Sequence, residues 1–238
     1  MIDPSLLLLF AFIAALISGV IGFGAAMVFI SLGSLFFPIK SVIFLGTVFF
    51  LAMNASKILL YAKHIHGRLA VLIILAALPG TYLGANFMVA SDPEFLEKGL
   101  GAIILMYVIW ASRNQKALKK LSRPLLIGGS FLYGLVAGAV GTGGVIKAVI
   151  LDRMGLTKEA FVGTMAVTAG LSNVIKLWVY SSLPLAEKTN YGLMIGLIII
   201  AFIGTWLGRH VLRRLTPERF RNLVLGFLLI ISLRLILL

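Results

Sequence analysis

The chain alternates between long apolar stretches and short segments that carry most of its charged residues. Apolar stretches of about 20 residues recur from one end of the sequence to the other. An α-helix rises about 1.5 Å per residue, so about 20 residues are needed to cross the roughly 30 Å of hydrocarbon in a bilayer. The pattern therefore predicts an all-α integral membrane protein with no separate soluble domain.

Five short motifs occur twice along the chain, in the same order in each half. Residues 18–24 (SGVIGFG) are echoed by residues 137–143 (AGAVGTG). The other pairs are residues 44–47 with 161–164, 54–57 with 173–176, 80–84 with 204–208, and 93–101 with 217–226. Apolar sequence of low complexity can imitate one such pair, but five ordered pairs that include polar residues indicate an internal duplication.

Each repeat is expected to hold one glycine-interrupted segment followed by three ordinary spans. The first repeat covers residues 1–112, the second covers residues 124–238, and a basic linker at 113–123 joins them. The segments of the first repeat are 6–37, 42–60, 69–89 and 99–111. Those of the second are 125–151, 160–180, 191–212 and 223–238.

The distribution of basic residues distinguishes two ways of threading this chain through a bilayer. Lys57, Lys147 and Lys176 lie within apolar sequence, and eight full crossings divide the other 18 of the 21 basic residues evenly. If each glycine-interrupted segment is instead a helical hairpin, 14 of the 18 fall on one side. The positive-inside rule favours the hairpins and makes that side cytoplasmic, in a plasma or inner membrane. The segment 125–151 then divides at Gly141 into arms of about 10 to 16 residues, which are too short to span. Three full spans per half then invert the second repeat relative to the first.

Composition restricts the partners and the chemistry. The chain is 61% hydrophobic and 12% charged, against about a quarter charged in soluble domains. Its net charge of +13 is spread over short loops, so the lipid bilayer and not nucleic acid is the expected partner. Cysteine is absent, which excludes thiolate metal sites. His64 and His66 are interpreted as solvated loop residues and not as metal ligands, and no cofactor is expected.

The glycine breaks are the first candidates for a binding site. Gly22 and Gly24 interrupt the first segment, and Gly141, Gly143 and Gly144 interrupt the second. Free amides at a helix start in mid-membrane are tolerated where they face protein or an aqueous cavity, and their dipole attracts an anion. The alternative is that these glycines only allow close helix packing. The hydroxyl of Thr142 lies within the second break.

Three lysines within apolar sequence are the second set of candidates. Lys147 follows the second break by one turn, where a charge costs about 2.5 to 3.5 kcal/mol. Asn54 with Lys57, and Asn173 with Lys176, are repeat-related pairs that each share one helix face. The alternative is that these long side chains snorkel to the membrane surface.

Acidic residues avoid the predicted spans. All eight fall in loops or at segment ends: Asp3, Asp92, Glu94, Glu97, Asp152, Glu159, Glu187 and Glu218. This argues against an intramembrane aspartyl protease and against a carboxylate-based cation carrier. Because no set of nucleophile, base and acid is found, no enzymatic activity is expected, and the polar groups that remain favour an anion.

The order of the motifs resembles the TauE/SafE-type sulfite exporter family over nearly the whole chain. Each Gly-x-Gly break is followed after about 20 residues by Gly-Thr, and later by Gly-Thr-aromatic-Leu-Gly. The chain departs from the family in Ala25, Ala26 and Ser31 at the first break, and in Lys147, where the family is commonly apolar. The resemblance implies a transporter of small sulfur-containing anions such as sulfite or organosulfonates.

The sequence therefore predicts a secondary transporter with an alternating-access site at the midplane between the two hairpins, and the family resemblance implies that it is an exporter. An anion channel, or a permease for another small anion, is the alternative. A carrier saturates and shows trans-stimulation, and a channel shows neither. The oligomeric state is left open.

Overall fold

The computed structural model describes residues 4–21, 23–113, 121–182 and 191–211, and residues 229, 232, 233 and 236. Over this part of the chain the regular structure is entirely helical. The helices are α1 (Pro4–Ile21), α2 (Ala25–Ser34), α3 (Ile39–Tyr61), η1 (Ala62–His64), α4 (Gly67–Ala90), α5 (Pro93–Arg113), α6 (Arg123–Val140), α7 (Gly144–Asp152), α8 (Lys158–Tyr180) and α10 (Tyr191–Val211).

Five of the described helices are long and apolar enough to cross a membrane. They are α3 with η1, α4, α6, α8 and residues 191–208 of α10. Four of the predicted spans coincide with α3, α4, α8 and α10 to within a few residues. The predicted span 99–111 lies inside α5, which is not among the five. Gly22, linker residues 114–120 and nearly all of the predicted span 223–238 lie outside the described residues.

Both glycine-interrupted segments are broken helices, and the arms of the second are less equal than the predicted 10 to 16 residues. The first arms, α1 and α6, have 18 residues each, and the second arms have ten and nine. The predicted length is wrong for α6 because that helix begins at Arg123, with Pro124 in its first turn. Proline is favoured there, since its fixed backbone angle suits a helix start and the amide it lacks has no partner in any case. At 18 residues α6 is itself long enough to span.

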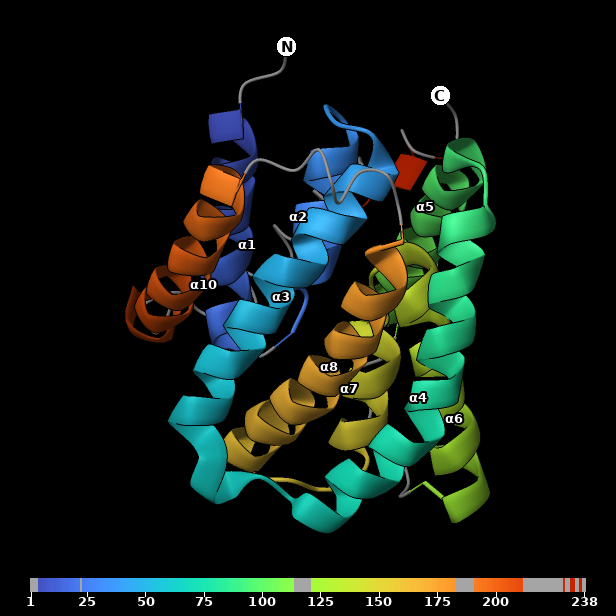
Figure 1. Ribbon diagram of the computed structural model, residues 1–238. Helices are drawn as coiled ribbons and strands as arrows, with labels where there is room; N and C mark the ends of the chain where they lie inside the picture. Colours follow the sequence, from blue (N-terminus) through green and yellow to red (C-terminus); the bar gives the residue numbers. More distant parts are fainter. Residues whose placement is uncertain are drawn as a thin grey trace.

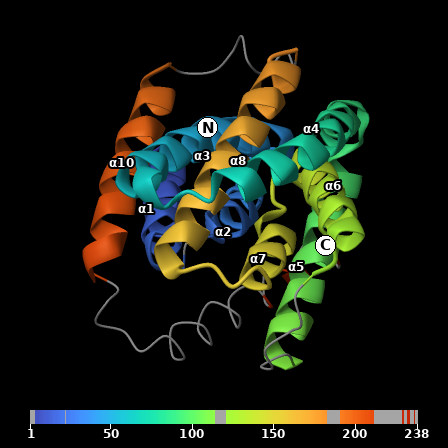
Figure 2. The ribbon, with the colours of Figure 1, turned by 90° about the horizontal axis from the view of Figure 1, so that it is seen from below.

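The helices form three groups that lie side by side (Figures 1 and 2). In the centre α3 packs along α8; α1 packs along α10 on one flank, and α4 along α6 on the other. A Cβ on Gly163 would touch Tyr61, and one on Gly170 would lie near Asn54, so α3 and α8 run antiparallel. The central pair therefore places segments from the two halves of the chain against each other.

Two long-range hydrogen bonds show which connections share an end of the bundle. The amide of His66 donates to Thr164 Oγ1 at 3.1 Å, and Lys40 Nζ donates to the carbonyl of Val89 at 2.9 Å. Connections 61–67 and 152–158 accordingly lie together at the lower end of Figure 1. Connections 34–39 and 90–93 lie at the opposite end.

Small residues form the flanking seams. A Cβ on Gly80 would collide with the carbonyl of Phe131, and one on Gly84 with the carbonyl of Leu135, so α4 and α6 are in backbone contact and run parallel. On the other flank, Gly208 of α10 lies against Gly19 of α1. Such close approach is typical of membrane helices, where packing and not hydrophobic burial drives association. The repeated Gly-Thr-aromatic-Leu-Gly motif of each half thus packs on the broken helix of the other half.

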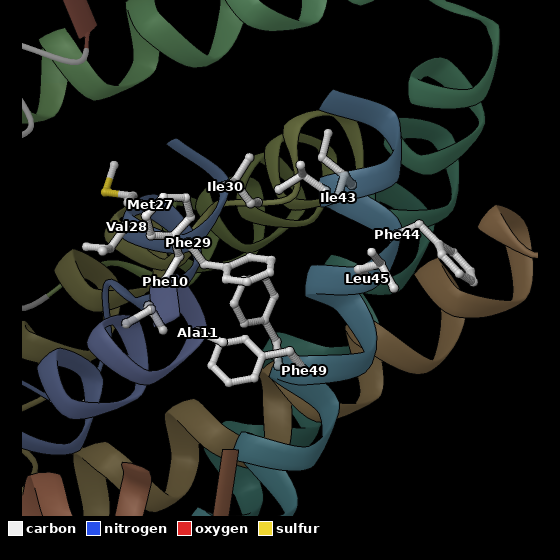
Figure 3. Close-up of a cluster of buried hydrophobic side chains, with 14 of the residues drawn as sticks. Phe10, Ala11, Met27, Val28, Phe29, Ile30, Ile43, Phe44, Leu45 and Phe49 are labelled. Atoms are coloured by element: carbon white, nitrogen blue, oxygen red, sulfur yellow. The ribbon is translucent and has the colours of Figure 1, made fainter. Parts of the chain in front are cut away.

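The main core lies between α1, α2 and α3 (Figure 3). The rings of Phe29, Phe49 and Phe50 meet with centroids 5.2 to 5.8 Å apart. A smaller cluster holds the start of α4, the start of α6, and α7 with its connection to α8. Both clusters pack on the breaks, which therefore sit between two apolar layers.

Candidate functional site

Each broken helix turns at a glycine in the left-handed conformation. Gly24 has φ +93° and Gly141 has φ +78°, values that L side chains rarely adopt. The first hydrogen bonds of the second arms are Val28 N to Gly24 O and Lys147 N to Gly143 O. The amides of the turn before each bond therefore have no acceptor in their own helix. Two sets of free helix-start amides result.

These two helix starts border one cavity of about 90 Å³. That size is on the scale of a few water molecules or a small oxyanion, and far below the roughly 300 to 1,000 Å³ of a drug-sized pocket. Phe23 at the first break and Gly144 at the second both line it, and a Cβ on Gly144 would lie 4.0 Å from Phe23 Cβ. Residues 19 and 138, by contrast, belong to the flanking seams.

Nine of the eleven residues predicted for the site line this cavity. They are Gly24, Asn54, Lys57, Gly141, Gly143, Gly144, Lys147, Asn173 and Lys176. Thr142 is buried but is not one of the lining residues, and Gly22 lies outside the described residues. The cavity thus joins the glycine breaks to the lysines of both halves.

The three lysines do not snorkel. Lys57, Lys147 and Lys176 are 4%, 1% and 2% exposed, whereas a snorkelling side chain keeps its ammonium group in water. The alternative of snorkelling is therefore wrong for all three side chains.

Lys147 has the most extensive set of contacts. Its Nζ donates to Tyr133 OH at 3.1 Å and to the carbonyl of Met165 at 3.0 Å, and it lies 4.4 Å from the centroid of the Tyr133 ring. Tyr133 OH in turn lies 3.4 Å from Ser172 Oγ, which is 3.5 Å from Thr81 Oγ1. A buried polar network therefore holds Lys147 at the start of α7.

The other two lysines contact the broken helices from the central pair. Lys176 Nζ donates to Asn173 Oδ1 at 3.0 Å and to the carbonyl of Gly141 at 3.4 Å. Lys57 Nζ donates to Ser18 Oγ at 2.6 Å, near the end of α1. Each lysine therefore braces the helix of its own half that leads into the break.

Sequence reasoning missed Ser18, Tyr133 and Ser172 as parts of the site. Tyr133 lies in α6, about two helical turns before the break at Gly141. Ser172 precedes Lys176 by four and so shares its face of α8. These spacings were visible in the sequence, but they gain meaning only once the breaks and lysines are known to share a cavity.

The side chains around the cavity that can carry a charge are of one sign. Among the described residues that line it, none is a carboxylate. The acidic side chains that the structure describes lie at helix ends or in loops, and the ion pair of Glu94 with Lys98, at 2.6 Å, is exposed. No group of three histidine or acidic side chains suited to a metal occurs in the described parts of the chain. Helix-start dipoles and lysines thus make a site whose chemistry suits an anion.

The family comparison agrees with this chemistry. The family model described as Sulfite exporter TauE/SafE matches residues 7–235. No curated protein and no solved structure matches the chain. Since the family match spans nearly the whole chain, which also has several helices able to cross a membrane, the protein is a multi-pass membrane protein that belongs to the TauE/SafE sulfite exporter family.

Proposed function

We propose that the chain is a secondary transporter that exports small sulfur-containing anions, such as sulfite or organosulfonates, across a plasma or inner membrane. The observation that carries the proposal is the cavity itself. Two helix starts and three buried lysines surround it, and no carboxylate of the described chain lines it. The substrate-binding residues are proposed to be the nine lining residues named above, with Gly22 and Thr142 completing the two breaks.

The proposal includes two inverted repeats, residues 1–112 and 124–238, joined by the linker 113–123. The antiparallel course of α3 and α8, which carry the repeat-related Asn/Lys pairs, supports this arrangement. The distribution of charge supports it as well. Lys63, Arg68, Arg153 and Lys158 lie in or directly beside connections at one end of the bundle, and Lys40 and Asp92 in or directly beside connections at the other. The first end is proposed to be cytoplasmic.

Alternating access is proposed to work by movement of the broken helices against the central pair α3 and α8. This proposal is supported by the two apolar layers above and below the breaks, which differ in thickness. Towards the upper end the main core, with Phe29, Ile30 and Ile43, packs on the breaks. Towards the lower end the half-buried Phe23 lines the cavity and packs edge-on against Phe161, with ring centroids 6.5 Å apart.

The aromatic pair is proposed to be the thin barrier on the lower side. A cysteine in place of Ala169, which lines the cavity, has no competing thiol because the chain contains no cysteine. Phe23→Ala should speed its modification by a charged thiol reagent added from the side of the 152–158 connection. An unchanged rate, with the protein folded, would remove Phe23 from the barrier.

Counterflow in proteoliposomes tests the function. Vesicles with purified protein and unlabelled sulfite inside should accumulate labelled sulfite from outside, and sulfonates, carboxylates and halides should be compared as competitors. Saturation together with trans-stimulation is expected for a carrier. A flux that is linear in concentration and indifferent to the trans anion would instead support an anion channel, and a preference for another small anion would support a different permease.

A further inference from the structure

The acceptors of two of the three buried lysines, Lys147 and Lys176, are neutral. Those of Lys147 are a phenol and a backbone carbonyl, and those of Lys176 are an amide oxygen and a backbone carbonyl. Neutral dipoles orient an ammonium group and replace part of its hydration, but they leave its net charge in place. Lys57, which donates to the hydroxyl of Ser18, adds a third amine to the same cavity.

The backbone adds to this positive potential. Both α2 and α7 begin at the cavity, each behind a glycine turn. A helix start carries a partial positive charge of about half an elementary charge. The two helix starts therefore point charge of the same sign at the space that the lysines already border.

Closing a cavity of this kind on both sides is costly without an anion. Removing an ammonium group from water is expensive unless an opposite charge accompanies it. When the site is open to water on one side, solvent and counterions offset the charge. During the passage between the two open forms both apolar layers are closed, and for lysines that keep their protons only a bound anion can offset the charge.

We infer that the protein is an obligatory anion exchanger, in which the site changes sides only with an anion bound. The inference rests on the proposed function at this same cavity. It adds that the export of one anion requires the import of another. The trans partner is any small anion that the cavity accepts, including a second molecule of the substrate.

One other route would allow the site to return empty. Each lysine could release its proton to water before closure, and net transport would then proceed with proton movement. This route gives a different flux pattern, because it needs no trans anion. Exchange and empty return can therefore be separated by measuring net uptake and exchange side by side.

The experiment uses purified protein in proteoliposomes under anaerobic conditions. Labelled sulfite is added outside vesicles that hold either unlabelled sulfite or gluconate, a much larger anion. Valinomycin with potassium and a protonophore remove electrical and proton gradients. Exchange is expected to exceed net uptake at least about tenfold, because an empty crossing carries the additional barrier.

Two variants sharpen the result. Lys147→Met removes one cavity charge and should raise the ratio of net uptake to exchange. Lys98→Met removes a charge of the same sign from an exposed ion pair outside the cavity, and should keep the wild-type ratio. Net uptake as fast as exchange in the wild-type protein, with or without proton movement, would overturn the inference.

A calorimetric titration of the purified protein with sulfite separates this failure from that of the proposed function. If sulfite binds but net uptake equals exchange, the exchange inference alone is wrong. If sulfite neither binds nor shows counterflow, the proposed function itself is wrong, and the inference falls with it.

Discussion

The ammonium group of Lys147 lies 3.1 Å from the hydroxyl oxygen of Tyr133 and 4.4 Å from the centre of the same ring. One aromatic side chain thus offers the lysine both an acceptor and a π face. Since Tyr133 OH also lies 3.4 Å from Ser172 Oγ, α6, α7 and α8 are joined at the site. The position of the charge is therefore fixed by three helices and not by α7 alone.

Lys147→Met should weaken sulfite binding by about 1 to 3 kcal/mol, or about 5- to 150-fold in Kd, as for a lost hydrogen bond to a charged group. Tyr133→Phe should cost less, because the ring beneath the ammonium group remains. Isothermal titration calorimetry on purified protein measures both, with Lys98→Met as the charge-matched control. If Lys147→Met binds sulfite as the wild type does, the lysine has no part in binding.

Gly144→Leu should abolish transport while the protein stays folded. A Cβ at this position would have only Phe23 Cβ nearby, at 4.0 Å, so the longer side chain can extend into the cavity. Counterflow and thermal unfolding in detergent should be measured together. Wild-type transport by a folded Gly144→Leu protein would show that the second helix start does not border the transport path.

Gly143 and Gly141 are less suitable for that test, although the sequence singles them out equally. A Cβ on Gly143 would approach the carbonyl of Tyr133 at 2.7 Å, and one on Gly141 would approach Ile30 Cδ1 at 2.5 Å. Bulky residues there should lower the melting temperature as well as transport, because overpacking typically costs about 1 to 3 kcal/mol. A bulky variant at Gly143 with an unchanged melting temperature would contradict this packing.

Single cysteines at Ser122 and Lys158 should react with an impermeant thiol reagent from the same side of sealed membranes, and one at Ser91 from the opposite side. Ser122 directly precedes α6, and Lys158 begins α8 at the same end of the bundle. Ser91 follows α4 at the other end. Labelling of Ser122 and Lys158 from opposite sides would contradict the inverted arrangement.

The seam between α4 and α6 should tolerate no added methyl group at Gly84. Gly84→Ala would place a Cβ against the carbonyl of Leu135 and 2.9 Å from the amide of Ala139. A loss of about 1 to 3 kcal/mol is expected and should appear as a lower melting temperature. Gly128→Ala is the matched control, since no atom lies within 4 Å of its Cβ position. Equal melting temperatures for the two variants would contradict the close seam.

Much of the helical framework follows from local sequence. Apolar run length placed α3, α4, α8 and α10, and the backbone freedom of Gly24 and Gly141 marked the two turns, because both properties act within a few residues. The Asn173–Lys176 hydrogen bond, at 3.0 Å, is likewise a contact within one helix turn. Such features depend on neighbours along the chain and can be read without a fold.

Features that depend on contacts between distant segments could not be predicted in this way. Tyr133 contacts Lys147 and Ser172 only because α6, α7 and α8 meet. The difference in length between α6 and α7 depends on where α6 begins. The apolar pattern alone does not show that this helix begins at Arg123. The burial of Lys57 and Lys176 depends on the packing of α3 against α8, whereas the sequence showed two lysines near helix ends.

The flanking seams join helices from the two halves of the chain, and this has a consequence for biosynthesis. The first arm α1 packs on α10, which begins at Tyr191, and α4 packs on α6. A ribosome adds about 5 to 20 residues per second, so α1 waits on the order of 10 to 30 s for its partner to be made. During that time the face of α1 that carries Ala15 and Gly19 is open to other membrane helices. The amino-terminal half is therefore expected to be a client of membrane insertion factors that shelter unpaired helices, and truncated chains ending before Tyr191 should be degraded rapidly.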